Sequence, residues 1–171
     1  MNATVAKVLP LRIGVIGGNQ IDDKLYAQAE EVGRLLAEEG AWIVCGGMGG
    51  AMEAVCKGAA ERGGTTIGIL PDDHLERANE FVKIPLATGL GYARNYIIVH
   101  NADAFIAIGG SEGTLNEMAA ALNLGRTVVA LGSWKLEKAG QLRRGNLVQA
   151  KSAQAAVAAA LDAAKAARRK V

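Results

Sequence analysis

Short runs of apolar residues alternate along the chain with stretches in which apolar side chains recur at helical spacing. The apolar runs do not alternate polar with apolar positions, so both faces of each predicted strand are expected to be covered. This pattern predicts an α/β fold of the doubly wound type, with a mostly parallel sheet and helices on both of its faces. The predicted strands are Leu11–Gly17, Trp42–Cys45, Thr65–Leu70, Val82–Ala87, Asp103–Ile108 and Thr127–Leu131.

Helical patterns fill most of the intervals between these strands. Asp22 is the expected N-cap of a first helix that ends near Gly40. A last, alanine-rich helix is predicted from about Ser152. The interval Trp134–Lys151 has weak periodicity and is interpreted as a surface loop, with a lid as the alternative. The apolar stripes of the first three helices are Leu25, Ala29, Val32, Leu35 and Leu36; Met52, Val55, Cys56, Ala59 and Ala60; and Leu115, Met118, Ala119 and Leu122.

Length and composition limit the classes of protein to consider. The 171 residues, half of them apolar, fit a single domain over residues 1–171 with a sizeable core. A net charge of +2, without basic residues interleaved with aromatic ones, argues against nucleic acid as a partner. No segment reaches the apolar length of a membrane span or a secretory leader, so a cytoplasmic location is expected.

Cysteine and histidine show no metal-ligand spacing. Cys45 lies in an apolar strand and Cys56 on the apolar face of a helix, away from His74 and His100. Both thiols are therefore interpreted as buried and inert, and no metal site is predicted. No cofactor is expected to be needed for folding.

Three glycine-rich turns each follow a predicted strand. Glycine allows positive φ and close approach of a ligand to the backbone, while the helix that follows a turn directs free N–H groups at an anion. Parallel strands place their outgoing loops at one edge of the sheet, so these turns are expected to form one phosphate-binding cleft. The phosphate-binding residues predicted in the turns are Gly17, Gly18, Gly46, Gly47, Gly49, Gly50, Gly109, Gly110, Ser111, Glu112, Gly113 and Thr114.

The usual nucleotide fingerprints are missing. No Gly-Lys-Ser/Thr triplet occurs, which disfavours a P-loop. The second predicted strand ends Val44-Cys45-Gly46, without the acid that holds the ribose of NAD. A smaller phosphorylated ligand fits the pattern better.

Arg94 opens a helical segment, Gly91-Tyr92-Ala93-Arg94, where a cation opposes the helix dipole. It shares a face with Ile97 and Ile98, so its side chain is expected to lean over the sheet edge toward a bound anion. The alternative is a structural salt bridge to Asp72, Asp73 or Asp103.

Glu117 has two interpretations. Thr114-Leu115-Asn116-Glu117 matches the Thr-x-x-Glu capping box, in which case Glu117 only caps a helix. It is also placed roughly opposite the Leu115/Met118/Leu122 stripe, where its carboxylate could meet the sugar of a ligand. Beside it, Ala120 and Ala121 form a small-residue face that predicts packing against a second subunit, in a dimer or tetramer.

These motifs together resemble the LONELY GUY (LOG)-related, SLOG-type Rossmann-like superfamily, over about Leu11–Leu131. Its members include phosphoribohydrolases that release ribose 5-phosphate from nucleoside 5′-monophosphates, molybdenum-cofactor carrier proteins, and proteins labelled lysine decarboxylase-like, a chemistry for which this chain shows no motif. The residues that carry the resemblance are Gly46-Gly47-Met48-Gly49-Gly50-Ala51-Met52-Glu53, Gly63-Gly64-Thr65-Thr66-Ile67-Gly68-Ile69-Leu70-Pro71 and Gly109-Gly110-Ser111-Glu112-Gly113-Thr114 with Glu117.

For a phosphoribohydrolase the resemblance implies that Glu117 and Arg94 are catalytic. The enzymes' turn is Pro-Gly-Gly-x-Gly-Thr, whereas this chain has Ile108 in place of the proline and one residue more before Gly113. The arginine of these enzymes lies in the motif Met-His-x-Arg-Lys. In this chain Asn95 occupies the position of the lysine. The small size of the chain, this longer glycine turn and Gly89-Leu90-Gly91 before the arginine segment resemble the carrier proteins more closely.

A carrier or sensor of a phosphorylated heterocycle, either the molybdenum cofactor or a nucleotide, is therefore the predicted function. Arg94 and the glycine turns are its expected phosphate contacts. The alternatives are the phosphoribohydrolase and a structural or regulatory oligomer that binds no ligand.

Overall fold

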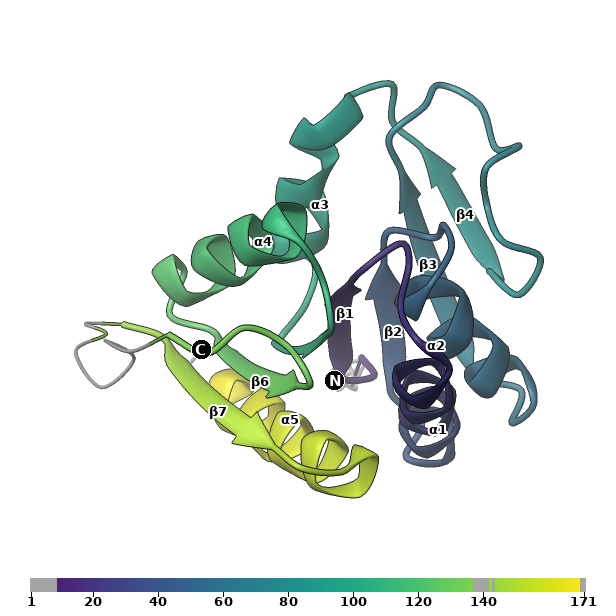
Figure 1. The fold of residues 1–171 in the computed structure, drawn as a ribbon. Helices are drawn as coiled ribbons and strands as arrows, with labels where there is room; N and C mark the ends of the chain where they lie inside the picture. Colours follow the sequence, from purple (N-terminus) through teal and green to yellow (C-terminus); the bar gives the residue numbers. More distant parts are fainter. Residues whose placement is uncertain (1–8, 137–141, 143, 170–171) are drawn as a thin grey trace, which may run out of the picture.

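The sheet is fully parallel and has seven strands, in the order β4-β3-β2-β1-β5-β6-β7 (Figure 1). The computed structural model describes residues 9–136, 142 and 144–169. The predicted doubly wound, Rossmann-like α/β fold is confirmed. The strands are β1 (Arg12–Gly17), β2 (Trp42–Cys45), β3 (Thr65–Leu70), β4 (Ile84–Ala87), β5 (Ala104–Ile108), β6 (Thr127–Leu131) and β7 (Asn146–Ala150).

Helices cover both faces of the sheet (Figure 1). On one face lie α1 (Asp23–Glu38), α2 (Ala51–Ala60) and α5 (Ala153–Arg168). On the other lie α3 (Asn95–His100), which continues a short 3₁₀ turn η1 (Gly91–Arg94), and α4 (Glu112–Asn123). The predicted N-cap is confirmed, since the Leu25 amide donates to Asp22 Oδ1 over 2.8 Å. In the part of the chain that is described, no helix combines the length and the apolar character needed to cross a membrane.

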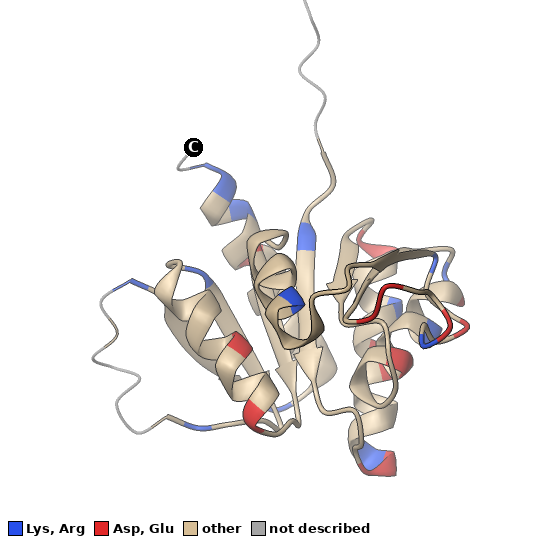
Figure 2. Cartoon of the chain, turned by 90° about the horizontal axis from the view of Figure 1, so that it is seen from above, with Lys and Arg blue, Asp and Glu red and all other residues tan. Residues whose placement is uncertain are grey.

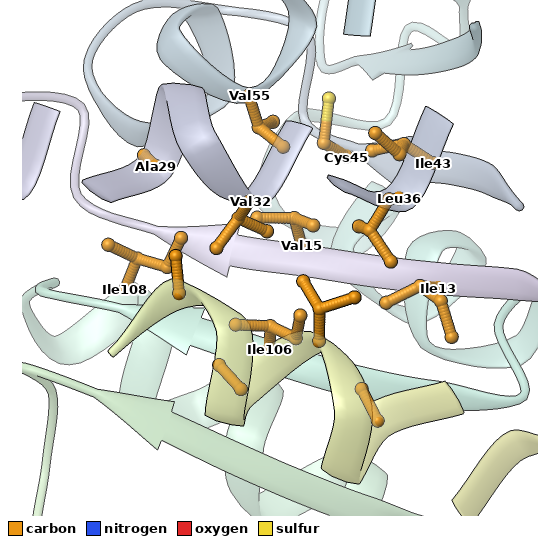
Figure 3. Packing of buried hydrophobic residues seen from close by; sticks show 14 of the residues in the cluster. Ile13, Val15, Ala29, Val32, Leu36, Ile43, Cys45, Val55, Ile106 and Ile108 are labelled. Atoms are coloured by element: carbon orange, nitrogen blue, oxygen red, sulfur yellow. The ribbon is translucent and has the colours of Figure 1, made fainter. Parts of the chain in front are cut away.

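Two hydrophobic clusters hold these layers together. Figure 3 shows the larger, in which side chains of β1, β2 and β5 meet α1 and α2. The second cluster packs α3 and α4 against the opposite face of the same strands, around the fully buried Phe105. Because each central strand contributes to both clusters, its sequence is apolar throughout, as predicted.

The crossing of α1 and α2 depends on two glycines. A Cβ on Gly58 would lie 1.8 Å from the Glu30 carbonyl oxygen, and one on Gly33 would lie 2.1 Å from that of Val55. The two helix backbones therefore approach more closely than any larger residue permits.

The prediction of a loop over Trp134–Lys151 is wrong in its last part, because β7 occupies Asn146–Ala150. This strand pairs with β6 alone and lies at the edge of the sheet, so it is only partly buried and carries no continuous apolar run. Within the same interval, residues 137–141 and 143 lie outside the described residues.

The strand order reverses direction between β1 and β5, which are neighbours in the sheet although α1 leaves on one face and α4 on the other. Ligands of open α/β sheets bind beyond the carboxyl ends of the strands at this kind of position. The Gly18 amide donates to the Ile108 carbonyl across the gap over 3.3 Å, which joins the first and third glycine turns.

Candidate functional site

A cleft of about 270 Å³ lies at this reversal point, beyond the carboxyl ends of β1, β2 and β5. Its walls come from five regions of the sequence that the fold brings together. It is lined by Val15, Ile16, Gly17, Asn19, Gly46, Met48, Met52, Arg77, Tyr92, Arg94, Asn95, Ser111, Gly113, Thr114 and Glu117.

The N-terminus of α4 opens into this cleft without a cap. Ser111 occupies the N-cap position, and its side chain accepts no hydrogen bond from the helix. The first backbone amide of the helix with an intrahelical acceptor is that of Leu115, which donates to the Ser111 carbonyl over 3.1 Å. The N–H groups of Glu112, Gly113 and Thr114 are thus left without an intrahelical acceptor, as helix geometry requires. Three free amides at the positive end of a helix form an anion-binding position.

The backbone before α4 takes conformations that only glycine tolerates. Gly109 and Gly110 have φ values of 56° and 106°. A Cβ on Gly110 would lie 2.3 Å from the Thr114 hydroxyl oxygen. The two glycines therefore allow the strand to turn directly into the uncapped helix.

The turn at Gly46–Gly50 uses its polar groups differently. The Ala51 amide donates to the Gly18 carbonyl over 2.9 Å, and the Gly49 amide donates to Asn19 Oδ1 over 3.1 Å. A Cβ on Gly50 would lie 2.3 Å from the Gly18 carbonyl oxygen. Packing against the first glycine turn therefore accounts for much of this glycine content, and the amides of Gly49 and Ala51 are already bonded.

The predicted phosphate-binding residues divide accordingly. Those that line the cleft are Gly17, Gly46, Arg94, Ser111, Gly113 and Thr114. Those that do not line it are Gly18, Gly47, Gly49, Gly50, Gly109, Gly110 and Glu112.

Arg94 lines the cleft and is only 6% exposed. Its Nη1 donates to the Ile69 carbonyl over 2.5 Å, and the guanidinium lies so close to Gly46 that a Cβ there would be 2.4 Å from Nη1. Burial lowers the pKa of Arg94, while the nearby Glu117 opposes that effect. A cation buried in this way is costly unless an anion joins it.

The salt-bridge alternative for Arg94 is wrong for Asp72 and Asp103. Asp72 pairs with Arg77 at 3.2 Å, and Asp103 pairs with Arg168 at 2.6 Å, at the opposite end of the sheet. Among the described residues no carboxylate lies within 4.0 Å of the Arg94 guanidinium, so Asp73 does not pair with it either.

Glu117 projects from α4 into the same cleft and is 8% exposed. Its carboxylate has no hydrogen-bond donor among the described residues. Burial raises the pKa of Glu117 to about 7, although the charge of Arg94 works against the rise. A carboxyl group with such a pKa can hold or release a proton near neutral pH.

The capping-box interpretation of Glu117 is wrong. The helix begins at Glu112, so Thr114 is already inside it and cannot be the N-cap. The placement of Glu117 opposite the apolar stripe is also wrong, because Glu117 lies on the buried face together with Thr114 and Met118. Of the predicted stripe, Ala119 is exposed instead.

The small-residue face proposed for a second subunit is not available as predicted. Ala121 is fully buried within the chain, against β5 and β6, and Ala120 is partly buried against the same cluster. The outward side of α4 carries Asn116 and Ala119 instead.

Sequence reasoning missed several residues of the cleft, of which Arg77 carries a charge. Arg77 belongs to the connection between β3 and β4, and a position in a loop that leaves the carboxyl end of a strand was the available signal. The other missed residues are Val15, Ile16, Asn19, Met48, Met52, Tyr92 and Asn95.

Cys45 and Cys56 are buried free thiols, as predicted, with their sulfur atoms 3.6 Å apart. A hydrogen bond with Cys45 and burial raise the pKa of the Cys56 thiol. In the described ranges, no three side chains of His, Cys, Asp or Glu gather as metal ligands do.

Two curated relatives and one solved structure show what the chain is similar to. A protein of Archaeoglobus fulgidus described as uncharacterized is 46% identical over 121 residues, which are 71% of this chain and 80% of that protein. The cytokinin riboside 5′-monophosphate phosphoribohydrolase of Mycobacterium tuberculosis is 35% identical over 98 residues, 56% of this chain, and the chain matches about half, 52%, of its length.

The structure of the molybdenum cofactor binding protein from Rippkaea orientalis superposes with a TM-score of 0.83 at 34% identity. The match covers 90% of this chain and 97% of that one. A family model described as the SLOG cluster4 family matches residues 10–160. These matches, together with a glycine-turn cleft at the reversal point of a parallel sheet, show that the chain belongs to the SLOG cluster4 family.

Proposed function

We propose that this protein binds a phosphorylated heterocyclic ligand and acts as its carrier or sensor. The observation that carries the proposal is the uncapped start of α4, where Ser111, Gly113 and Thr114 line the same cleft as the buried guanidinium of Arg94. The phosphate contacts the amides of Glu112, Gly113 and Thr114, and Arg94 adds a positive charge from the opposite wall. An anion there compensates both the helix dipole and the buried cation.

The molybdenum cofactor is the most specific candidate for the ligand, and a nucleotide is the more general one. Support for the cofactor comes from the similarity to the Rippkaea orientalis protein, which is described as binding it. On this proposal the whole chain is one cytoplasmic ligand-binding domain, and it assembles as a homo-oligomer.

Isothermal titration calorimetry with AMP and adenosine tests the proposal. Wild-type protein is expected to bind AMP more tightly than adenosine. Arg94→Ala is expected to weaken AMP binding about tenfold or more, the contribution of a charge-assisted hydrogen bond, and to leave adenosine binding unchanged. Arg62→Ala is the matched control, because it removes an exposed cation at the far end of α2. Equal losses for AMP and adenosine contradict a phosphate role for Arg94.

Glu117 supports a second candidate, a phosphoribohydrolase that cleaves nucleoside 5′-monophosphates. Its carboxyl group is buried in the cleft, has no hydrogen-bond partner in the described chain, and has a pKa of about 7. A group of this kind can activate a water molecule or stabilise an oxocarbenium-like sugar as the N-glycosidic bond breaks. The similarity to the Mycobacterium tuberculosis enzyme supports the same reaction.

Incubation of the protein with AMP, followed by chromatography for free adenine, separates the two candidates. Adenine release that disappears in Glu117→Gln favours the hydrolase and makes Glu117 catalytic. AMP that binds but stays intact favours the carrier or sensor.

A further inference from the structure

Arg77 is a second cation of the cleft, held by the connection between β3 and β4. Asn79, two residues further on, anchors that connection: its amide nitrogen Nδ2 donates to the Met48 carbonyl over 2.9 Å and to the Gly47 carbonyl over 3.1 Å. The Asn79 backbone N–H also donates to the Gly47 carbonyl, over 2.9 Å. The glycine turn at the cleft wall thereby fixes the backbone that carries Arg77.

The connection carries charges of both signs (Figure 2). Its carboxylates are Asp72, Asp73, Glu76 and Glu80, and none of them lines the cleft, whereas Arg77 does. Of the charged side chains named here, the fold therefore places only the positive one, Arg77, at the cleft.

The partner of Arg77 can be exchanged at little cost. Its Nη1 lies 3.3 Å and 3.2 Å from the two carboxylate oxygens of Asp72, at the long end of the hydrogen-bond range. The side chains of Arg77 and Asp72 are 57% and 25% exposed, and ion pairs of such exposure contribute little to stability. An anion in the cleft can therefore replace Asp72 as the partner of the Arg77 guanidinium without a large loss of protein stability.

Arg77 also disfavours the charge of Arg94, since it adds to the effect of burial in lowering the pKa of Arg94. The phosphate position at the start of α4 is formed by backbone amides and does not need Arg77. A cleft with the free amides at the start of α4, two guanidinium groups and one carboxyl group that is only partly ionised near neutral pH has an excess of positive charge.

We propose that Arg77 binds a second anionic group of the ligand, so that the ligand class is a phosphorylated heterocycle with two anionic groups. This rests on the proposed function, because it assigns the first phosphate to α4. One group contacts the amides of α4, and the second lies between Arg94 and Arg77, where it replaces Asp72.

Calorimetry with AMP, ADP and adenosine 3′,5′-bisphosphate tests this inference. ADP carries its second phosphate next to the first, and the bisphosphate carries it across the ribose. At least one of the two is expected to bind about tenfold more tightly than AMP, the gain from one charge-assisted contact. Arg77→Ala is expected to remove that gain, so that the tighter nucleotide and AMP then bind with affinities within about twofold of each other.

Two further variants separate binding from a structural role. Arg62→Ala removes a comparable exposed cation remote from the cleft and is expected to keep the gain. Asp72→Asn frees the Arg77 guanidinium and is expected to keep or increase the gain in affinity. If Arg77 served only in the ion pair with Asp72, then Asp72→Asn and Arg77→Ala would lose affinity alike. If AMP binds but a second phosphate adds no affinity, or if the gain survives Arg77→Ala, this inference is overturned while the proposed function stands. Failure of all three nucleotides to bind counts against the proposed function itself.

Discussion

Replacing Glu117 by glutamine tests the electrostatics of the cleft without a ligand. Glutamine has nearly the shape of a protonated glutamate and cannot ionise. Since the Glu117 carboxylate accepts no hydrogen bond in the described chain, the substitution takes an acceptor away from no existing donor. The variant therefore isolates the cost of ionising a buried carboxyl group.

The magnitude follows from the pKa. Burial raises the pKa of Glu117 from its ordinary value of 4.5 to about 7, which corresponds to about 3 kcal/mol at 1.36 kcal/mol per pKa unit. Between these two pH values the folded protein binds more protons than the unfolded chain, so wild-type stability falls as the pH rises through this window. Above about pH 7 the loss is complete, and Glu117→Gln does not suffer it.

Urea denaturation at half-unit steps from pH 4.5 to 8.5 measures the effect. The two proteins are expected to be equally stable at the acid end, and the variant is expected to be more stable by about 3 kcal/mol at pH 8. Glu112→Gln, which removes an exposed carboxylate from the first turn of the same helix, is the control for a change in charge. A stability difference between wild type and Glu117→Gln that does not change with pH would refute the reasoning.

Three further predictions concern the backbone and the thiols. Gly110→Ala is expected to destabilise the protein by about 1–3 kcal/mol, because Gly110 has a φ of 106° and a Cβ there would meet Thr114 at 2.3 Å. Thermal melts measure this loss. The control is Gly113→Ala, which should lose no stability because its Cβ would meet nothing within 4 Å. Gly58→Ala is expected to cost about 3 kcal/mol or more, since its Cβ would lie 1.8 Å from a carbonyl oxygen of α1; a melting temperature within 2 °C of wild type, less than about 1 kcal/mol for a chain of this size, would contradict the close helix crossing. Cys45 and Cys56, both buried, are expected to react with a disulfide reagent such as Ellman's reagent only as fast as the protein opens, so modification within seconds in native buffer would contradict their burial.

The fold could be predicted because its central strands are buried on both faces. β1, β2, β5 and β6 are nearly continuous apolar runs, and the glycines after β2 and β5 mark where each strand turns into a helix. β7 was not predicted, because it is not buried on both faces. As an edge strand it is exposed at Asn146 and Gln149, so its sequence is similar to that of a loop.

The site could be predicted only in part. Arg94 and Glu117 were identified from their positions near glycine turns, and the fold places both in one cleft. The role of each turn depends on tertiary contacts that no local pattern contains. The carbonyl of Gly18 and the side chain of Asn19 use amides of the Gly46–Gly50 turn, whereas the start of α4 has no such neighbours.

The central claim is that the free amides at the start of α4 bind the phosphate of the ligand. Titration of ¹⁵N-labelled protein with AMP, followed by amide chemical shifts and compared with adenosine, tests it most directly. The account predicts saturable shifts of the Glu112, Gly113 and Thr114 amides with AMP and much smaller ones with adenosine. Shifts of the same size with both compounds, or shifts confined to residues outside the cleft, would contradict it.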